Sequence, residues 1–195
     1  MVKKILLLAV LALALPLAAF ANSSIDISNA GGVISGGASG LTLTGSTLFK
    51  YGSTVGSNLG SVSFSTGALA SGSLTTGGTF AAGGSFEIIG NGTNGVPNGV
   101  IFNGTFSGPV TWTLVTLANG THNYTLQGAI ASTSGVAVGA TVQLTVNTGK
   151  GLFNGSVGLS SGDTNLSVPE PGTLSLLGTG LIGLAGVIRR KLSLS

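Results

Sequence analysis

The sequence predicts an all-β fold, an antiparallel β-sandwich-like domain flanked by an N-terminal signal-peptide helix and a C-terminal transmembrane helix. Three observations lead to this prediction. Apolar and small polar residues alternate in several short stretches, 35 of the 195 residues are glycine, and six Asn-Gly pairs punctuate the middle of the chain. Helical periodicity is absent from the sequence between residues 22 and 168. We therefore divide the chain into residues 1–21, 22–166 and 167–195.

The first segment has the three parts of a secretory signal peptide. Lys3 and Lys4 form a positive start, an apolar run follows, and Ala19 and Ala21 fit the small-x-small rule for signal peptidase. Pro16 breaks the helix just before that site. We expect cleavage after Ala21 and export of the remaining chain. An uncleaved membrane anchor is the weaker alternative, because the apolar run is short for a membrane span.

The central segment, 22–166, is predicted to consist of strands. The alternation is clearest in LTLTG, SVSFS, PVTWTLVTL, NYTLQGAI and TVQLTVN. In the first of these, Leu41 and Leu43 alternate with Thr42 and Thr44. Because successive side chains of a strand point to opposite faces, each stretch is expected to have one buried face and one exposed face.

Turns are predicted from the Asn-Gly pairs. The clearest hairpin is PVTWTLVTLANGTHNYTLQGAI, with Asn119-Gly120 at its tip, because Asn-Gly tolerates the positive φ of tight turns. Residues 90–99, GNGTNGVPNG, are expected to form a longer surface loop. The glycine-dense part from GGVISGGASG to TTGGTFAAGGSF fits the first sheet of a sandwich. A β-solenoid is the alternative, although no fixed repeat period supports it.

Composition limits the class of protein. The absence of cysteine excludes disulfide cross-links, so burial must hold the domain together, and ten aromatic residues between positions 22 and 168 are available for a core. The same region contains two lysines against three acidic residues. Nucleic acid is therefore not an expected partner, since binding it requires clustered Lys and Arg.

The middle of the chain offers little catalytic chemistry, and we expect no enzyme, cofactor or metal. His122 is interpreted as a hairpin residue, because a single histidine provides no metal-ligand spacing. GLSSG at 158–162 matches G-x-S-x-G, but no histidine follows it in the sequence. Asp26, Glu87 and Asp163 have no local pattern of a glycosidase pair.

The C-terminal segment, 167–195, contains Pro169, Glu170 and Pro171, whose two prolines keep the peptide extended and out of a sheet. An uncharged apolar run at 172–188 is then predicted to be a transmembrane helix, slightly short of the hydrocarbon thickness. The residues assigned to the membrane span are Thr173, which opens the run, and the apolar residues Leu174, Leu176, Leu177, Leu181, Ile182, Leu184, Val187 and Ile188. Arg189, Arg190 and Lys191 begin the basic tail at 189–195 and are expected to mark the cytoplasmic side.

This arrangement closely resembles the PEP-CTERM sorting signal of Gram-negative bacteria. The resemblance covers Val168 to about Lys191 and has Pro169–Pro171 as its signature tripeptide. It implies recognition by exosortase, a membrane-embedded cysteine transpeptidase-like enzyme, and removal of the tail from a precursor held in the inner membrane. It also implies delivery to the cell surface or extracellular matrix, in bacteria that make exopolysaccharide and biofilm.

The expected function is therefore that of an exported surface or matrix protein with a structural or adhesive role. Exopolysaccharide is the expected partner of the β domain, with Tyr51 or Tyr124 as candidate sugar contacts if they are exposed. Two alternatives remain open. The chain is a secreted matrix enzyme, or it is a β-domain protein held by a single membrane span without exosortase processing.

Overall fold

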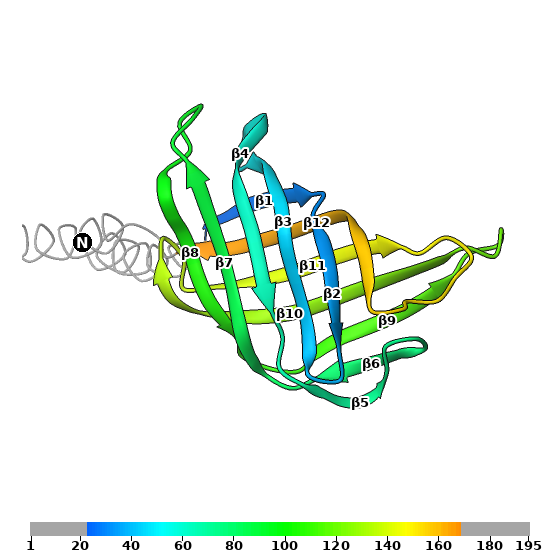
Figure 1. Ribbon diagram of the computed structural model, residues 1–195. Helices are drawn as coiled ribbons and strands as arrows, with labels where there is room; N and C mark the ends of the chain where they lie inside the picture. The colour runs from blue at the N-terminus through cyan, green and yellow to red at the C-terminus, as the bar shows by residue number, and fades with distance from the viewer. Residues whose placement is uncertain (1–22, 169–195) are drawn as a thin grey trace, which may run out of the picture. The chain divides into compact units, whose positions relative to one another are not determined.

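Twelve strands and no helix make up residues 23–168, the part of the chain that the computed structural model describes (Figure 1). The strands are β1 Ser23–Ala30, β2 Val33–Gly37, β3 Gly40–Tyr51, β4 Thr54–Ser65, β5 Leu69–Ser73, β6 Gly77–Phe80, β7 Gly83–Asn91, β8 Asn98–Phe106, β9 Val110–Thr116, β10 His122–Gly135, β11 Gly139–Asn147 and β12 Ser156–Val168. They form one antiparallel sheet. The predicted all-β antiparallel class is confirmed, and both predicted terminal helices fall outside the described residues.

The hydrogen-bonded ladder of this sheet closes on itself. Followed from strand to strand, it runs β2-β3-β4-β7-β8-β10-β11-β12 and returns to β2. Closure depends on β12, in which Val157 lies opposite Ile34 of β2 and Leu166 lies opposite Ala140 of β11. β1 lies beside β12 and β3, while β9, β6 and β5 extend the sheet from β10. Closure covers strand edges that would otherwise expose unpaired backbone groups.

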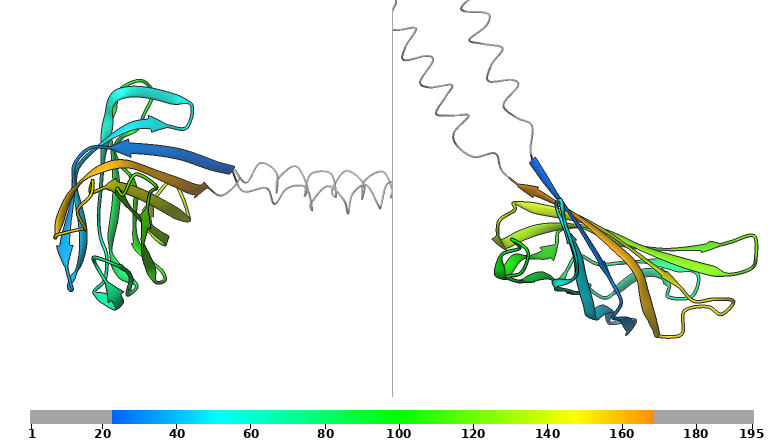
Figure 2. Two further views of the ribbon diagram at one scale, coloured as in Figure 1. Left: turned by 90° about the vertical axis from the view of Figure 1, so that its right-hand side faces the viewer. Right: turned by 90° about the horizontal axis from the view of Figure 1, so that it is seen from above.

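The closed ladder is flattened into two layers whose strands cross. β2, β3, β4 and β7 run down the front of Figure 1, and β9, β10, β11 and β12 cross behind them. Two further views show the same layers from the side and from above (Figure 2). This is the orthogonal type of sheet packing. The molecule differs from a sandwich of two separate sheets, because the pairings β8–β10 and β2–β12 carry the ladder from one layer to the other.

The predicted solenoid does not fit this topology. In a solenoid each coil contacts only its neighbours along the chain. Here β12 pairs with β2, near the opposite end of the described residues. The glycine-dense part of the sequence instead forms β2, β3, β4 and β7 of the closed ladder, together with β5 and β6 of its extension. Gly60 illustrates why glycine is needed there, since a Cβ at this position would lie 1.9 Å from the backbone oxygen of Ile89 on β7.

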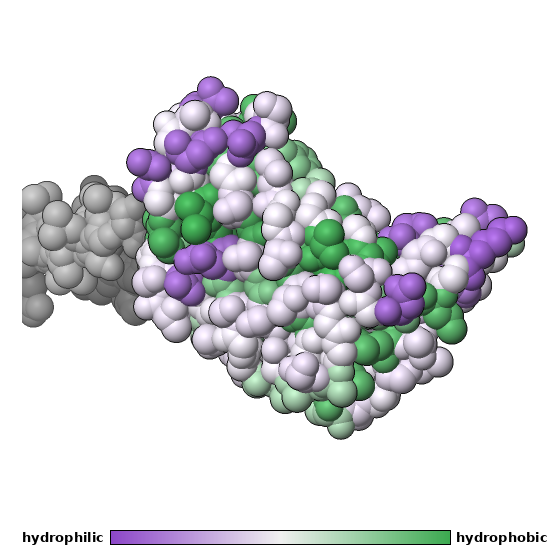
Figure 3. Space-filling view, in the orientation of Figure 1, coloured by the Kyte–Doolittle hydropathy of each residue, from purple (hydrophilic) through white to green (hydrophobic). Residues whose placement is uncertain are grey.

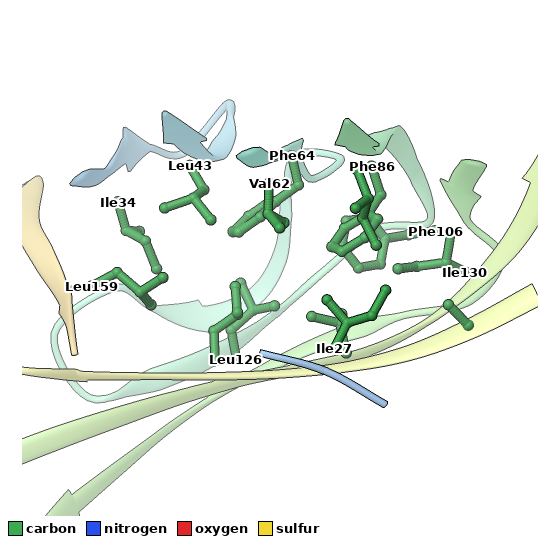
Figure 4. Packing of buried hydrophobic residues seen from close by; sticks show 14 of the residues in the cluster. Ile27, Ile34, Leu43, Val62, Phe64, Phe86, Phe106, Leu126, Ile130 and Leu159 are labelled. Carbon is green, nitrogen blue, oxygen red and sulfur yellow. The ribbon is translucent and has the colours of Figure 1, made fainter. Parts of the chain in front are cut away.

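The alternating stretches place their apolar residues in the core, as predicted. Leu41 and Leu43 are fully buried and their threonine neighbours are exposed. The same pattern holds for the other alternating strands, with Leu114 of β9 only half-buried. The buried set lies between the two layers, where Leu43, Val62 and Phe64 of the front layer point toward Leu126 of the back layer (Figure 4). Burial of such side chains contributes about 1.5–3 kcal/mol each.

Two groups of aromatic rings occupy different parts of this core. The first contains Phe64, Phe86, Phe102 and Phe106, with ring centroids 6.1–6.5 Å apart. The second contains Trp112, Tyr124 and Phe153, in which the Trp112 and Tyr124 rings stack at 4.9 Å. Both spacings are typical of favourable aromatic pairs. We call them the phenylalanine cluster and the tryptophan cluster.

The predicted hairpin at Asn119-Gly120 is confirmed and its turn is now defined. β9 and β10 pair with His122 opposite Thr116. The amide of Leu117 donates to the carbonyl of Thr121, which closes a three-residue loop, and the amide of Gly120 donates to the carbonyl of Leu117. Among the three loop residues 118–120, Gly120 is the one with a positive φ, of 77°. This is expected for a type I turn followed by a left-handed residue.

The loop predicted at residues 90–99 is present but shorter, because β7 continues to Asn91 and β8 begins at Asn98, which leaves residues 92–97 as the connection. Asn94 and Gly95 both have positive φ, 54° and 81°, and the amide of Val96 donates to the carbonyl of Thr93. These features define a type I′ turn. Val96 is buried, so this loop packs one apolar side chain into the core.

Candidate functional site

The outer face of the back layer consists of rows of polar side chains that run across the strands. In one row Thr111, Gln127, Gln143 and Asp163 lie opposite one another on β9, β10, β11 and β12. All four are exposed. Directly opposite residues in an antiparallel pair bring their side chains within contact distance. The register therefore gathers two carboxamides and one carboxylate from strands that are distant in sequence.

A shallow open depression of about 390 Å³ lies over the β1, β10, β11 and β12 part of this face. Its polar lining is Asp26, Gln127, Thr141, Gln143, Asp163, Thr164 and Asn165. We call it the polar depression. The sequence predicted that Gln127, Thr141 and Gln143 would face outward, and all three side chains are exposed, which confirms this. It did not predict that they would meet Asp26 and Asp163, because that depends on the pairings of β12.

Hydrogen bonds hold the side chains of the polar depression in place. Nε2 of Gln127 donates to Oε1 of Gln143 at 2.9 Å, and Oγ of Ser28 donates to Oδ1 of Asp163 at 2.9 Å. The ammonium group of Lys50 contacts Oδ2 of Asp26 at 2.6 Å. Both members of this ion pair are partly exposed, so it contributes at most about 1 kcal/mol to stability. Each of these groups keeps further capacity to accept or donate hydrogen bonds.

The acidic residues are divided between two parts of the sheet. Asp26 and Asp163 both line the polar depression, whereas Glu87 lies on β7 of the other layer, opposite Ser63 and Asn103. Residues 23–168 contain no group of three or more His, Asp or Glu side chains that could hold a metal ion. The polar groups that line the polar depression are amides, carboxylates and hydroxyls, all of which can form hydrogen bonds.

His122 is a hairpin residue, as expected from its position. Its Nδ1 lies 3.1 Å from Oγ1 of Thr116, and its amide donates to the carbonyl of Gly149. Ser160, the central serine of GLSSG, lies within β12. A nucleophile elbow requires a sharp turn between a strand and a helix, which a residue inside a strand does not provide.

The two tyrosines considered as sugar contacts occupy different environments. Tyr124 is fully buried, and its hydroxyl donates to the carbonyl of Thr75 at 2.7 Å. It is therefore unavailable for contact with an external sugar ring. Tyr51 is half-buried against the core, and this burial raises the pKa of its hydroxyl. Within residues 23–168, Phe49 is the only other aromatic side chain outside the fully buried set.

The front layer presents a similar surface of hydroxyl rows. Ser35, Thr42, Ser65 and Ser85 form one of its rows, from β2 to β7. The hydroxyls of Ser65 and Ser85 lie 2.9 Å apart. Most of this face is of intermediate hydropathy, and its strongly hydrophilic residues gather mainly toward the loops at its ends (Figure 3). Both layers therefore expose hydroxyl and amide groups with few charges.

β12 ends at Val168, and Pro169, Glu170 and Pro171 follow it directly in the sequence. In the part of the chain that the structure covers, no helix has both the length and the apolar character needed to cross a membrane. The predicted signal-peptidase site at Ala19 and Ala21 lies outside the described residues. So do the sorting tripeptide, the predicted membrane span at 172–188 and the basic residues Arg189, Arg190 and Lys191; these assignments remain predictions from sequence.

The β-rich domain is followed at once in the sequence by a proline-flanked acidic residue, an apolar run and a basic tail, which is the arrangement of a C-terminal sorting segment. Residues 167–191 match the family model of the PEP-CTERM protein-sorting motif. No curated protein and no solved structure matches the chain. The motif implies a membrane-anchored precursor, exosortase as the processing partner, and export to the cell surface.

Proposed function

We propose that the β domain of this exported protein is a non-enzymatic module that binds neutral polysaccharide at the cell surface. Its role is structural or adhesive, in the exopolysaccharide of a biofilm matrix. The observation that carries the proposal is the polar depression, where Gln127, Gln143 and Asp163 lie side by side on one exposed row. Planar amides and carboxylates are suited to hydrogen-bond neighbouring hydroxyls of a sugar.

Charge favours a neutral ligand over an anionic one. Asp26 and Asp163 both line the polar depression, and only Asp26 has a lysine beside it. A polyanion such as nucleic acid or a uronic acid polymer would meet uncompensated carboxylate there. The many hydroxyl groups on both layers provide further weak contacts along a long polymer. Repeated weak contacts give useful retention because a polymer presents many equivalent segments at once.

The proposal that the domain is non-enzymatic is supported by the structural contacts of its aspartates and its histidine. Asp26 contacts Lys50, Asp163 accepts a hydrogen bond from Ser28, and His122 contacts Thr116 at the end of the β9–β10 hairpin. Each therefore has a local structural interaction. A glycosidase would use its two carboxyl groups on the scissile bond, whereas the two carboxylates of this depression are engaged with Lys50 and Ser28.

The test is sedimentation of the processed protein with the producing cell's own exopolysaccharide. The double variant Gln127→Ala/Gln143→Ala should lower retention at least about tenfold, since each lost hydrogen bond contributes about 1 kcal/mol. The matched control is Ser65→Ala/Ser85→Ala, which removes a cross-strand pair from the front layer and should leave retention near wild type. Equal retention of all three proteins contradicts the proposed site. Release of reducing ends by the wild-type protein would instead identify a matrix enzyme.

A second test addresses the sorting of the precursor. Glu170→Ala should leave the protein in the inner-membrane fraction with its tail attached, because the acidic residue of the tripeptide is changed. Fractionation followed by intact-mass measurement reports both location and tail removal. If wild type and variant reach the surface equally and both keep the tail, the chain is a single-span anchored protein that is not processed.

A further inference from the structure

The sorting motif overlaps the last strand of the folded domain. The match begins at residue 167, whereas β12 continues to Val168. Pro169 is the next residue, so no residue separates the sheet from the tripeptide. The enzyme that reads Pro169–Pro171 must therefore work directly against the end of a strand.

The end of β12 is firmly held in the sheet. Leu166 is fully buried and lies opposite Ala140 of β11. Ser167 lies opposite Gly139, and its carbonyl accepts a hydrogen bond from the amide of Val138 at 2.9 Å. β1 lies on the other side of β12. The backbone at the end of β12 is thus paired with β11 and with the connection before it.

An enzyme that binds an extended peptide needs access to its backbone groups. In the tripeptide, the two prolines provide no backbone N–H. The nearest N-terminal residues that could supply such groups are Leu166, Ser167 and Val168, and these are part of the sheet. Three extended residues span about 10 Å, so their release would move the folded domain well away from the tripeptide.

We propose that processing by exosortase requires local release of Leu166–Val168 from β11 and the connection before it. Leu166 is the positioning residue, because the burial of its side chain holds the end of the strand in place. Local openings of this kind occur without global unfolding and cost less free energy than unfolding the whole domain. The stability of the end of β12 then sets how fast the precursor is converted.

The first test inserts about six Gly and Ser residues between Val168 and Pro169, enough to span roughly 20 Å when extended. A pulse-chase measurement of full-length precursor in the producing cell should show conversion several-fold faster than wild type. The matched control places the same insertion after Gly151, in the connection between β11 and β12, and should convert at the wild-type rate. Conversion of the spacer variant at the wild-type rate would overturn the proposal.

The second test separates release of the strand end from steric obstruction of exosortase by the adjacent folded domain. Leu166→Ala should speed conversion at least about tenfold without the spacer, since loss of a buried leucine shifts opening by that factor or more. With the spacer present, it should have no further effect. An equal acceleration in both backgrounds, or none in either, contradicts a role for strand release.

A matched variant tests for global unfolding. Leu144 is equally buried on β11, opposite Gly162 and away from the end of β12. Leu144→Ala should destabilise the domain to a similar degree but leave conversion close to wild type. If it accelerates conversion as much as Leu166→Ala, the route is global unfolding and the proposal is wrong. The spacer variant leaves the folded residues unchanged, so its result does not depend on how well either alanine variant folds.

Discussion

The phenylalanine cluster and the tryptophan cluster stabilise the same sheet in different ways. Phe64, Phe86, Phe102 and Phe106 contribute only apolar contact, within strands that are already paired. Each polar-tipped ring of the tryptophan cluster bonds to backbone outside the strands. Nε1 of Trp112 donates to the carbonyl of Leu74 at 2.9 Å.

Tyr124 extends this difference. Its hydroxyl donates to the carbonyl of Thr75 and accepts a hydrogen bond from the amide of Phe153. Thr75 lies between β5 and β6, and Phe153 lies between β11 and β12. The comparison teaches that apolar rings hold the layers together, whereas a ring with a polar tip also fixes the position of connections that lack ladder hydrogen bonds.

The largest expected effect comes from removing the centre of the phenylalanine cluster. Phe86 contacts three other rings and is fully buried. Phe86→Ala should lower the free energy of unfolding by about 3–5 kcal/mol through lost contacts and a cavity. Urea unfolding of the processed protein measures this. Phe49→Ala, at a half-buried position on β3, is the control and should cost much less.

An intermediate effect is expected from Tyr124→Phe, which keeps the ring and removes the hydroxyl. The variant leaves the carbonyl of Thr75 and the amide of Phe153 without their partner, at a cost of about 1–3 kcal/mol. Hydrogen exchange should increase most at Phe153 and its neighbours. Uniform loss of protection over all strands would show that the hydroxyl supports the whole core rather than one connection.

The smallest effect is expected from Tyr51→Phe, because the Tyr51 hydroxyl has no hydrogen-bond partner among residues 23–168. Near neutral pH the variant should match wild type within a few tenths of a kcal/mol. Burial raises the pKa of Tyr51 above 10.0, so above that pH the unfolded chain loses the proton more readily than the folded one. Wild-type stability should therefore fall as pH rises through this range, and the variant should lack that part of the fall.

Local sequence signals were sufficient for much of the fold. Alternation correctly placed Leu41, Leu43, Val62 and Phe64 in the core, and Asn119-Gly120 located a hairpin. These signals depend only on neighbouring residues, because side-chain direction and turn geometry are set over a few positions. The pairing of strands across the ring has no such signal in a single sequence.

β12 shows why alternation fails in one strand. Its register shifts where Val146 of β11 lies opposite Leu159, so the inward-facing positions change from odd to even numbers. Two of those inward positions are Gly162 and Thr164 rather than apolar residues. A Cβ at Gly162 would lie 2.4 Å from Cδ2 of Leu144 and 2.5 Å from Oδ1 of Asn29, so a larger residue would require these side chains to move. The sequence of β12 therefore lacks the regular apolar–polar alternation from which the neighbouring strands were predicted.

The candidate site was predictable only in part for the same reason. The outward direction of Gln127, Thr141 and Gln143 follows from alternation, but their proximity to Asp26 and Asp163 requires the register of β1 and β12. The sorting motif is the opposite case. Its parts are consecutive in the sequence, so the motif could be recognised from the order of Pro169–Pro171, the apolar run and the basic tail without knowledge of the fold.

The pairing of β12 with β1 and β2 also has a consequence for the time course of export. The strand that closes the ladder is the last part of the domain to be synthesised, and contacts between such distant segments form slowly. A chain still emerging from the membrane therefore lacks the piece that completes its fold. We expect the chain to stay unfolded, and so able to pass through a narrow channel, until nearly all of it has crossed. A chain cut after Gly151 should accordingly remain sensitive to protease.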